Sequence, residues 1–264
     1  MERESWCDAD VARAYAEGFS DATRQCVEPM VRAVGAAPGV RVLDLCCGPG
    51  IVSAELVAHG AHVTGLDFSE PMLERARRVV DRATFVHGDA NTLPFEDGAF
   101  DAVTIGFGLP HLPEPERALM EVRRVMRTGG RLAFTCWQGA ATSTAFAIAM
   151  NAVETRGMAG VALPSGPDFW TLADRDAAFG ALTRTGFTPM DFATIHSRWI
   201  VADPDRVYDY FAEGTARMRA LLQAQPPRRR AAIRSAMREA VMSLPRNGKG
   251  WVVPIPAALT VAVA

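Results

Sequence analysis

The chain has 264 residues, of which 49% are hydrophobic and 22% charged, and its net charge is −2 at pH 7. This composition is typical of a globular protein with a sizeable core and gives no signature of nucleic-acid binding. The five cysteines form no C-x-x-C pair, and the charged start MERESWCDAD lacks the apolar stretch of a signal peptide, so we expect a reducing, cytoplasmic location. Lys249 is the only lysine among 28 basic residues, a bias typical of GC-rich bacterial genes.

Strands and helices alternate over the first half of the chain. Helical spacing over 9–34 ends at Gly35, and Gly129 with Gly130 is expected to end a later helix. The predicted strands are 40–45, 61–67, 83–89, 100–108 and 131–137, and the predicted helices between them are 51–60, 69–80 and 115–126. This order predicts a parallel, doubly wound α/β sheet.

The regular alternation of predicted strands and helices ends after Trp137. The pattern predicts a helical insertion over 138–170, a helix over 174–187 and a strand over 192–201. Two helices, broken at Pro226–Pro227, are expected within 204–243. The apolar end, 251–264, is too short and too interrupted by proline to span a bilayer, so we expect it to be one buried last strand.

The segment VLDLCCGPG, residues 42–50, joins the first strand to a helix through a glycine turn. Such a turn lets a ligand approach the backbone closely, and the helix presents free N–H groups to it. A dinucleotide fingerprint needs a third glycine where Ser53 stands. The carboxylate of Asp44 at the strand end suits a cation better than a pyrophosphate. A nicotinamide dehydrogenase is therefore a poor candidate.

Two more acids end the next two strands. Asp67 follows Gly50 by 17 residues, the place of a residue that accepts ribose hydroxyls, and Asp89 ends the third strand. Carboxyl ends of parallel strands share one edge of the sheet, so Asp44, Asp67 and Asp89 are expected to lie together. Each alone is an ordinary turn or cap residue, whereas the set in register with the glycine turn indicates a cofactor site.

Four segments, VLDLCCGPG, VTGLDFSEPML, FVHGDANTLPFEDGAFDAV and VMRTGGRLAFTCW, resemble the successive motifs of class I S-adenosylmethionine-dependent methyltransferases. The similarity points to the branch with the ubiquinone/menaquinone methyltransferases and natural-product tailoring enzymes. It implies a Rossmann-like, seven-stranded, mostly parallel sheet with an antiparallel last strand and a helical lid insertion. The expected organisation is a single domain, 1–264, with an N-terminal helical cap (1–37), a cofactor-binding core (38–137) and a substrate lid (138–173 and 202–250).

The resemblance also implies residue roles towards S-adenosylmethionine and the product S-adenosyl-L-homocysteine. Asp44 and the Gly48 backbone would hold the methionine amino group, Asp67 the ribose, and Asp89 the adenine amino group. Tyr15 would touch the carboxylate, although a core position is equally expected. The implied cofactor contacts are Tyr15, Asp44, Cys46, Gly48, Gly50, Asp67, Phe68, Met72, Asp89, Ala90, Gly106 and Phe107.

Cysteine and histidine offer further chemistry. For Cys46 and Cys47, packing under the cofactor loop is favoured over a nucleophile or a metal site, because His59 and His62 do not complete a ligand set. His111 follows the fourth strand and is the candidate general base, against the alternative of a loop histidine bonded to backbone. No metal is expected.

These observations predict methyl transfer to an O, N or C atom of a small, partly apolar molecule, as a natural-product tailoring step. A quinone-ring C-methyltransferase of primary metabolism is one alternative. A cyclase or binding protein that keeps the cofactor fold without methylating is another. The expected partner is a small molecule, without nucleic acid or membrane, and the sequence leaves a homodimer open. The basic stretch 206–249 has few interleaved aromatics, which favours a solvated helix face.

Overall fold

The computed structural model describes residues 2–166 and 168–264. Residue 1 of the predicted cap and residue 167 of the predicted lid lie outside the described residues. The chain forms two compact units. The larger comprises 23–137, 167–195 and 257–264, and the smaller comprises 1–22, 138–166 and 196–256.

The larger unit is built on a seven-stranded sheet in the order β3-β2-β1-β4-β5-β10-β6. β1 pairs in parallel with both β2 and β4, while β10 runs antiparallel between β5 and β6. The Rossmann-like sheet expected from the sequence is therefore confirmed. Its strands are β1 (Arg41–Leu45), β2 (His62–Asp67), β3 (Ala83–His87), β4 (Phe100–Gly106), β5 (Met126–Trp137), β6 (Thr188–Ile195) and β10 (Ala257–Val263).

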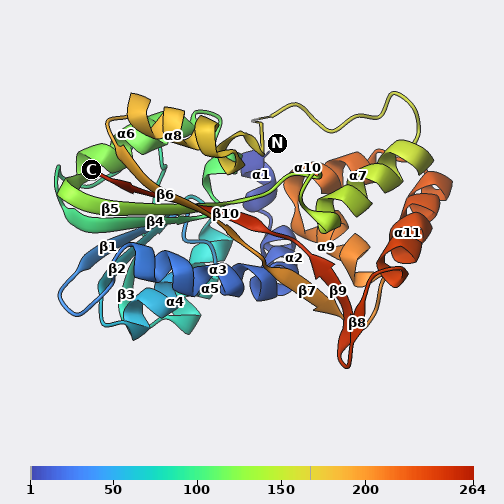
Figure 1. Ribbon diagram of the computed structural model, residues 1–264, viewed down its shortest axis with the longest axis horizontal. Helices are drawn as coiled ribbons and strands as arrows, with labels where there is room; N and C mark the ends of the chain where they lie inside the picture. Colours follow the sequence, from blue (N-terminus) through green and yellow to red (C-terminus); the bar gives the residue numbers. More distant parts are fainter. Residues whose placement is uncertain (1, 167) are drawn as a thin grey trace. The chain divides into compact units, whose positions relative to one another are not determined.

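Helices cover both faces of this sheet (Figure 1). α6 and α8 enclose one core with Leu43, Val103 and Phe134, and α3 and α4 enclose the other with Val42 and Ala133. β1 and β4 are neighbours although β2 and β3 come between them in the chain, which makes their carboxyl ends the switch point where such sheets bind ligands. The helices are α3 (Ser20–Ala33), α4 (Ile51–Ala58), α5 (Glu70–Val79), η1 (Leu109–His111), α6 (Pro115–Val125), η2 (Thr171–Ala173) and α8 (Arg175–Arg184).

The smaller unit is mainly helical. Its aromatic centre joins Phe19, Trp199 and Phe211 edge to face, with Phe146 against Phe211. A three-stranded sheet, β7-β9-β8, was not expected from the sequence. The elements are α1 (Glu2–Trp6), α2 (Ala9–Gly18), α7 (Thr144–Arg156), β7 (Arg198–Val201), α9 (Arg206–Gly214), α10 (Ala216–Gln223), α11 (Pro227–Met242), β8 (Arg246–Asn247) and β9 (Gly250–Pro254).

Several predicted boundaries were wrong. The segments 192–201 and 251–264 are each two strands, β6 with β7 and β9 with β10. Ser197 and Ile255 bond to each other at these breaks, and Pro256 offers no N–H to a sheet. The segment 204–243 holds three helices. Among the described residues of the predicted insertion, only α7 is an α-helix.

The prediction that Gly129 and Gly130 end a helix was also wrong. β5 already begins at Met126, and Gly129, at φ +77°, lies within it. The pairing with β4 jumps from Phe100–Met126 to Ala102–Arg131, so the extra residues form a bulge rather than a helix end.

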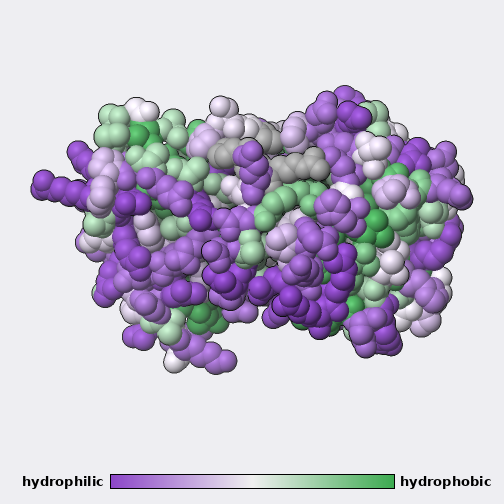
Figure 2. Space-filling model, turned by 180° about the vertical axis from the view of Figure 1, so that it is seen from behind, coloured by the Kyte–Doolittle hydropathy of each residue, from purple (hydrophilic) through white to green (hydrophobic). Residues whose placement is uncertain are grey.

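Large exposed hydrophobic side chains are scattered. The view in Figure 2 shows a mostly hydrophilic face with smaller hydrophobic areas. Within the described ranges, none of the helices has both the length and the apolar character that a membrane span needs. The exposed large hydrophobic residues are Val79, Met120, Met158, Met190, Ile200 and Met242.

Candidate cofactor and active site

The turn after β1 is held in left-handed backbone conformations. The φ angles of Cys46, Gly48 and Gly50 are +55°, +52° and +83°. A Cβ on Gly50 would lie 3.1 Å from the Cβ of Ala76 on α5, which requires glycine for close packing. Around Gly48, by contrast, no atom from another part of the described chain lies within 4 Å of where a Cβ would be. The turn therefore presents its backbone to space that a ligand can fill.

Asp67 ties the end of β2 to this turn. Its Oδ2 accepts from the Gly48 N–H at 2.8 Å, and its Oδ1 accepts from the Ser69 N–H at 2.9 Å. Burial raises the pKa of this carboxyl, and the two backbone hydrogen bonds partly oppose that shift. A carboxylate has about four acceptor positions, so these backbone bonds leave acceptor capacity for a ligand hydroxyl.

Asp44 lies deeper, at 1% exposure. Its Oδ2 accepts from the Ser53 hydroxyl at 2.5 Å and its Oδ1 from the Thr104 hydroxyl at 3.1 Å. Burial raises its pKa from 3.8 to about 6, against the lowering effect of the two hydroxyls. The predicted direct contact of Asp44 with an amino group remains a prediction. The geometry favours a positioning role, in which the carboxylate joins β1, β4 and α4 beneath the turn.

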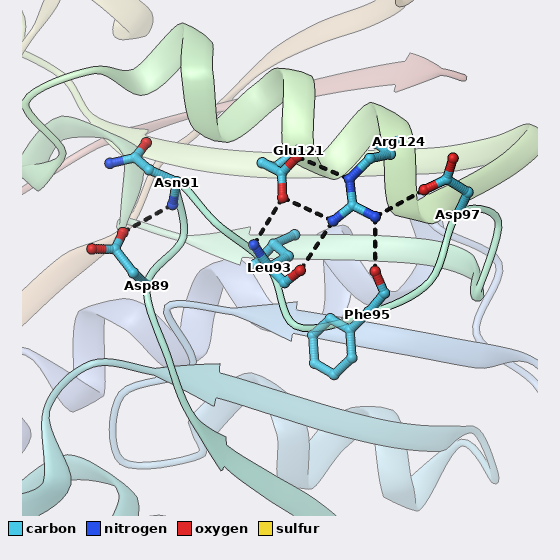
Figure 3. A network of polar contacts seen from close by, with 7 residues as sticks. All are labelled: Asp89, Asn91, Leu93, Phe95, Asp97, Glu121 and Arg124. Carbon is cyan, nitrogen blue, oxygen red and sulfur yellow. Dashed lines mark hydrogen bonds and ion pairs between the residues drawn. The ribbon is translucent and has the colours of Figure 1, made fainter.

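Asp89 opens the loop between β3 and β4. Its Oδ1 accepts from the Asn91 N–H at 2.9 Å, which folds the chain back after the half-buried carboxylate (Figure 3). Ala90 beside it is buried. Asp89 thus stands in a fixed turn beyond the end of β3.

An arginine on α6 anchors the rest of that loop. Arg124 donates to the carbonyls of Leu93 and Phe95 at 3.0 and 2.8 Å and pairs with Asp97 and Glu121 (Figure 3). Glu121 also accepts from the Leu93 N–H at 2.8 Å. These bonds raise the pKa of Arg124, so the guanidinium stays charged. The 89–97 loop is therefore held to α6 by charge-assisted hydrogen bonds.

The end of β4 packs against the glycine turn. A Cβ on Gly108 would collide with the Cys46 side chain, whose Sγ would be 2.8 Å away. Phe107 has φ +61° and stacks on Trp137 with ring centroids 3.9 Å apart. Cys46 and Phe107 are the two residues other than glycine with positive φ in the described chain, and they lie at neighbouring strand ends. Backbone strain is thus concentrated at the switch point.

The three strand-end acids act on one thiol. Burial raises the pKa of Cys46 well above its ordinary value, and the charges of Asp67, Asp44 and Asp89 raise it further. The thiol therefore stays protonated, which fits the packing role predicted for it and not a nucleophile. The same three carboxylates make the space above the turn attractive to a cation.

The remaining predicted residues divide into two groups. Phe68, half-buried after β2, and Met72, buried in α5, belong to the same unit as the turn. His111 is the last residue of η1, which begins directly after Gly108. Its ring lies edge to face with the ring of Phe169, and the ring centroids are 4.9 Å apart. Tyr15 belongs to the smaller unit, where it stacks on Phe19 at 5.1 Å.

A cavity of about 250 Å³ lies next to η1 in the larger unit. Its walls come from η1, α6, η2 and α8, and the Arg184–Glu116 ion pair lies at its edge. Its apolar walls include Leu109, Pro110, Phe169, Leu172, Ala177 and Ala181. A small ring system fits a cavity of this size and character.

Sequence reasoning missed the residues that support the site. In the sequence Ser53 only stands in the place of the third glycine of a dinucleotide motif, and Thr104 is one more residue of a buried strand. A hydroxyl in an otherwise apolar strand, or in the first turn of an apolar helix, was the available signal, because buried hydroxyls need partners. Nothing local indicated that Arg124 would hold the loop.

Comparisons with known proteins find similar sequences and similar folds. Residues 43–134 match the family model described as a methyltransferase domain. A demethylmenaquinone methyltransferase from Clavibacter sepedonicus is 54% identical over 104 residues, which are 38% of this chain and 42% of that protein. The chain spans less than half the length of the first curated relatives that it matches.

Solved structures extend the similarity to the fold. A Bacillus halodurans C-125 protein assigned as a methyltransferase aligns with a TM-score of 0.60 at 20% identity, covering 90% of this chain and 97% of that one. The cyclase SpnF aligns with a TM-score of 0.56 at 20% identity, covering 91% and 80%. These likenesses concern the fold alone.

Proposed function

We propose that this chain, which carries a class I S-adenosylmethionine-dependent methyltransferase domain, transfers a methyl group from S-adenosylmethionine to a small, partly apolar acceptor. The observation that carries the proposal is the open glycine turn bonded to Asp67, with the charges of Asp67, Asp44 and Asp89 all acting on its Cys46. The cofactor is a cation with ribose hydroxyls and an adenine amino group. The carboxylates suit each of these groups.

We propose the following cofactor roles, which the family resemblance implies and the positions of the side chains support. Asp67 accepts the ribose hydroxyls, and Asp89 with the Ala90 backbone recognises the adenine edge. Phe68 and Met72 line the adenine plane. The backbone from Gly106 to Gly108 runs along the methionine part, next to Gly48 and Gly50. Tyr15 closing on the carboxylate is a separate prediction.

The cofactor and the protein would contribute different parts of the methyl transfer. S-adenosylmethionine supplies a methyl group that is activated on a sulfonium. The protein aligns the acceptor with that methyl group and excludes water. His111, at the end of η1, takes a proton from an acceptor hydroxyl and so strengthens the nucleophile. The apolar part of the acceptor occupies the cavity beside Leu109 and Phe169.

A quinone-type ring is the acceptor favoured here, with a ring carbon as the attacked atom. Support comes from the relatives named demethylmenaquinone methyltransferase and from the apolar cavity. A reduced quinone also has the ring hydroxyl that His111 needs. The natural-product tailoring role expected from the sequence has no such support and stands as the second candidate.

Turnover with defined acceptors tests the proposal. Purified protein is incubated with S-adenosylmethionine and either a reduced, short-chain demethylmenaquinone or a simple phenol, and both products are followed by mass spectrometry. We expect S-adenosylhomocysteine and a ring-methylated quinone in equal amounts. Methylation of phenols alone would overturn the quinone assignment. Cofactor binding without S-adenosylhomocysteine from any acceptor, or a product formed without it, would favour the non-methylating alternative.

A further inference from the structure

A group of metal-ligating side chains lies outside the cofactor site, on the outer side of α3 and α4. Glu28 comes from α3, and Glu55 and His59 lie one turn apart at the end of α4. One ligand atom from each of the three residues lies within 4.8 Å of the others. The His59 Nε2 is 3.6 Å from Glu28 Oε2, and the Nδ1 is 3.6 Å from Glu55 Oε1. All three belong to the larger unit.

The imidazole of His59 is held in a tautomer suited to a metal. Its Nδ1 lies 3.0 Å from the main-chain oxygen of Glu55, which only accepts hydrogen bonds, so Nδ1 carries the proton. The lone pair is then on Nε2, the nitrogen that faces Glu28. A ring N–H donated to a backbone carbonyl is the usual support of a metal-bound histidine.

The two carboxylate oxygens of Glu28 face different partners. Its Oε1 accepts from Arg32 Nε at 2.5 Å, which leaves Oε2 towards the imidazole. The arginine therefore orients the carboxylate. It also neutralises part of the negative charge without occupying the oxygen that a metal would use.

The backbone beneath these three residues is fixed by the core. Val27 precedes Glu28 and Leu56 follows Glu55, and both are buried in the same cluster. The side chains themselves are between 33% and 43% exposed, so an ion can reach them and small rotations can close the ligand set. In a tetrahedral zinc site with bonds of about 2.0–2.1 Å, ligand atoms are about 3.4 Å apart, close to the 3.6 Å between His59 Nε2 and Glu28 Oε2. Glu55 must rotate its carboxylate from the Nδ1 side of the ring to join them, within a group whose ligand atoms lie at most 4.8 Å apart.

We propose that Glu28, Glu55 and His59 form a Zn²⁺ site that joins α3 to α4, with water as the fourth ligand. One imidazole and two carboxylates suit zinc among the common biological cations. The eight residues of α4 span about 12 Å, so the ion lies well away from the glycine turn at the other end of the helix. The ion stabilises the packing of α3 on α4 and takes no part in methyl transfer. Cys46 and Cys47 of the glycine turn are not ligands of this zinc site.

Calorimetric titration with Zn²⁺ tests the site. The protein carries Cys7→Ser, because Cys7 is an exposed thiol. We expect one site per chain, with an affinity that falls at least about tenfold in both His59→Gln and Glu28→Gln. His62→Gln is the matched control, since His62 is an exposed histidine nearby in the sequence, and it should bind like the parent. Co²⁺ in place of Zn²⁺ should give visible absorption without the strong near-ultraviolet band of a thiolate ligand.

The possible results separate clearly. Equal Zn²⁺ affinity in the parent, His59→Gln and Glu28→Gln, or a thiolate band with Co²⁺, overturns the proposal. A thermal unfolding midpoint that rises with Zn²⁺ in the parent but not in His59→Gln supports the structural role. S-adenosylmethionine binding should be unchanged in His59→Gln. A chain that binds zinc but not the cofactor would therefore contradict the proposed function and leave the metal site standing.

Discussion

The backbone N–H of Gly48 donates to Asp67 Oδ2 at 2.8 Å, which fixes the glycine turn after β1 to the carboxylate at the end of β2. The two residues are 19 positions apart in the chain. One side chain thus shapes the turn and also presents acceptor oxygens next to it. Both consequences can be measured.

Replacing Asp67 by alanine should weaken S-adenosylmethionine binding by roughly ten- to a hundredfold, because hydrogen bonds to a charged group contribute about 1.5–3 kcal/mol. Calorimetric titration with the cofactor and with S-adenosylhomocysteine measures the loss. Asp81→Ala, which removes an exposed acid between α5 and β3, is the control. Equal affinities of the two variants would contradict the ribose assignment.

The stability of the fold should depend on pH through Asp44. Burial raises its pKa from 3.8 to about 6, so the folded state holds the proton more tightly than the unfolded state. The stabilising contribution is complete below about pH 4 and is lost as the pH rises through about 6, by up to about 3 kcal/mol. Asp44→Asn should lack this loss. Urea unfolding of both proteins between about pH 4.5 and 7 tests this, and parallel stability curves would contradict it.

Gly108 and Cys46 should be energetically coupled. Gly108→Ala places a methyl group against the Cys46 side chain, and overpacking of this kind costs about 1–3 kcal/mol. Cys46→Gly removes the obstacle and also relieves the positive φ. The double variant should therefore recover most of the stability that Gly108→Ala loses. Additive changes in the free energy of unfolding would show that the two residues are not in contact.

Arg124 should control the order of the 89–97 loop. Arg124→Lys keeps the charge but loses the planar set of donors that reaches the carbonyls of Leu93 and Phe95. We expect faster amide hydrogen exchange in this loop and a modest loss of cofactor affinity. Arg117→Ala breaks an exposed pair with Glu114 and should change neither. Unchanged exchange in Arg124→Lys would mean that the loop is held by other contacts.

His111 should affect rate more than binding. His111→Gln removes the proton acceptor, which is expected to lower kcat about a hundredfold or more while the cofactor affinity stays the same. A histidine that only packs on Phe169 would leave kcat unchanged.

The sequence by itself determined the strand and helix order over residues 40–137, the parallel part of the sheet and the glycine turn with its three acids. These features depend on short-range patterns: apolar runs, glycines that permit positive φ, and acids at strand ends. The place of every strand-end acid at one sheet edge also follows from the sequence, because parallel strands joined by helices all point the same way.

Only the tertiary structure decided which groups complete the site. Thr104 reaches Asp44 from β4, 60 residues along the chain, and Arg124 reaches the carbonyl of Phe95 from α6, 29 residues away. Ser53 is only nine residues from Asp44, but its contact also depends on how α4 packs against β1. The division of 192–201 and 251–264 between two sheets was equally invisible locally, since both halves of each segment have strand-forming residues and the break is set by the bonds between Ser197 and Ile255. Such contacts depend on how the chain folds back on itself, which no local pattern encodes.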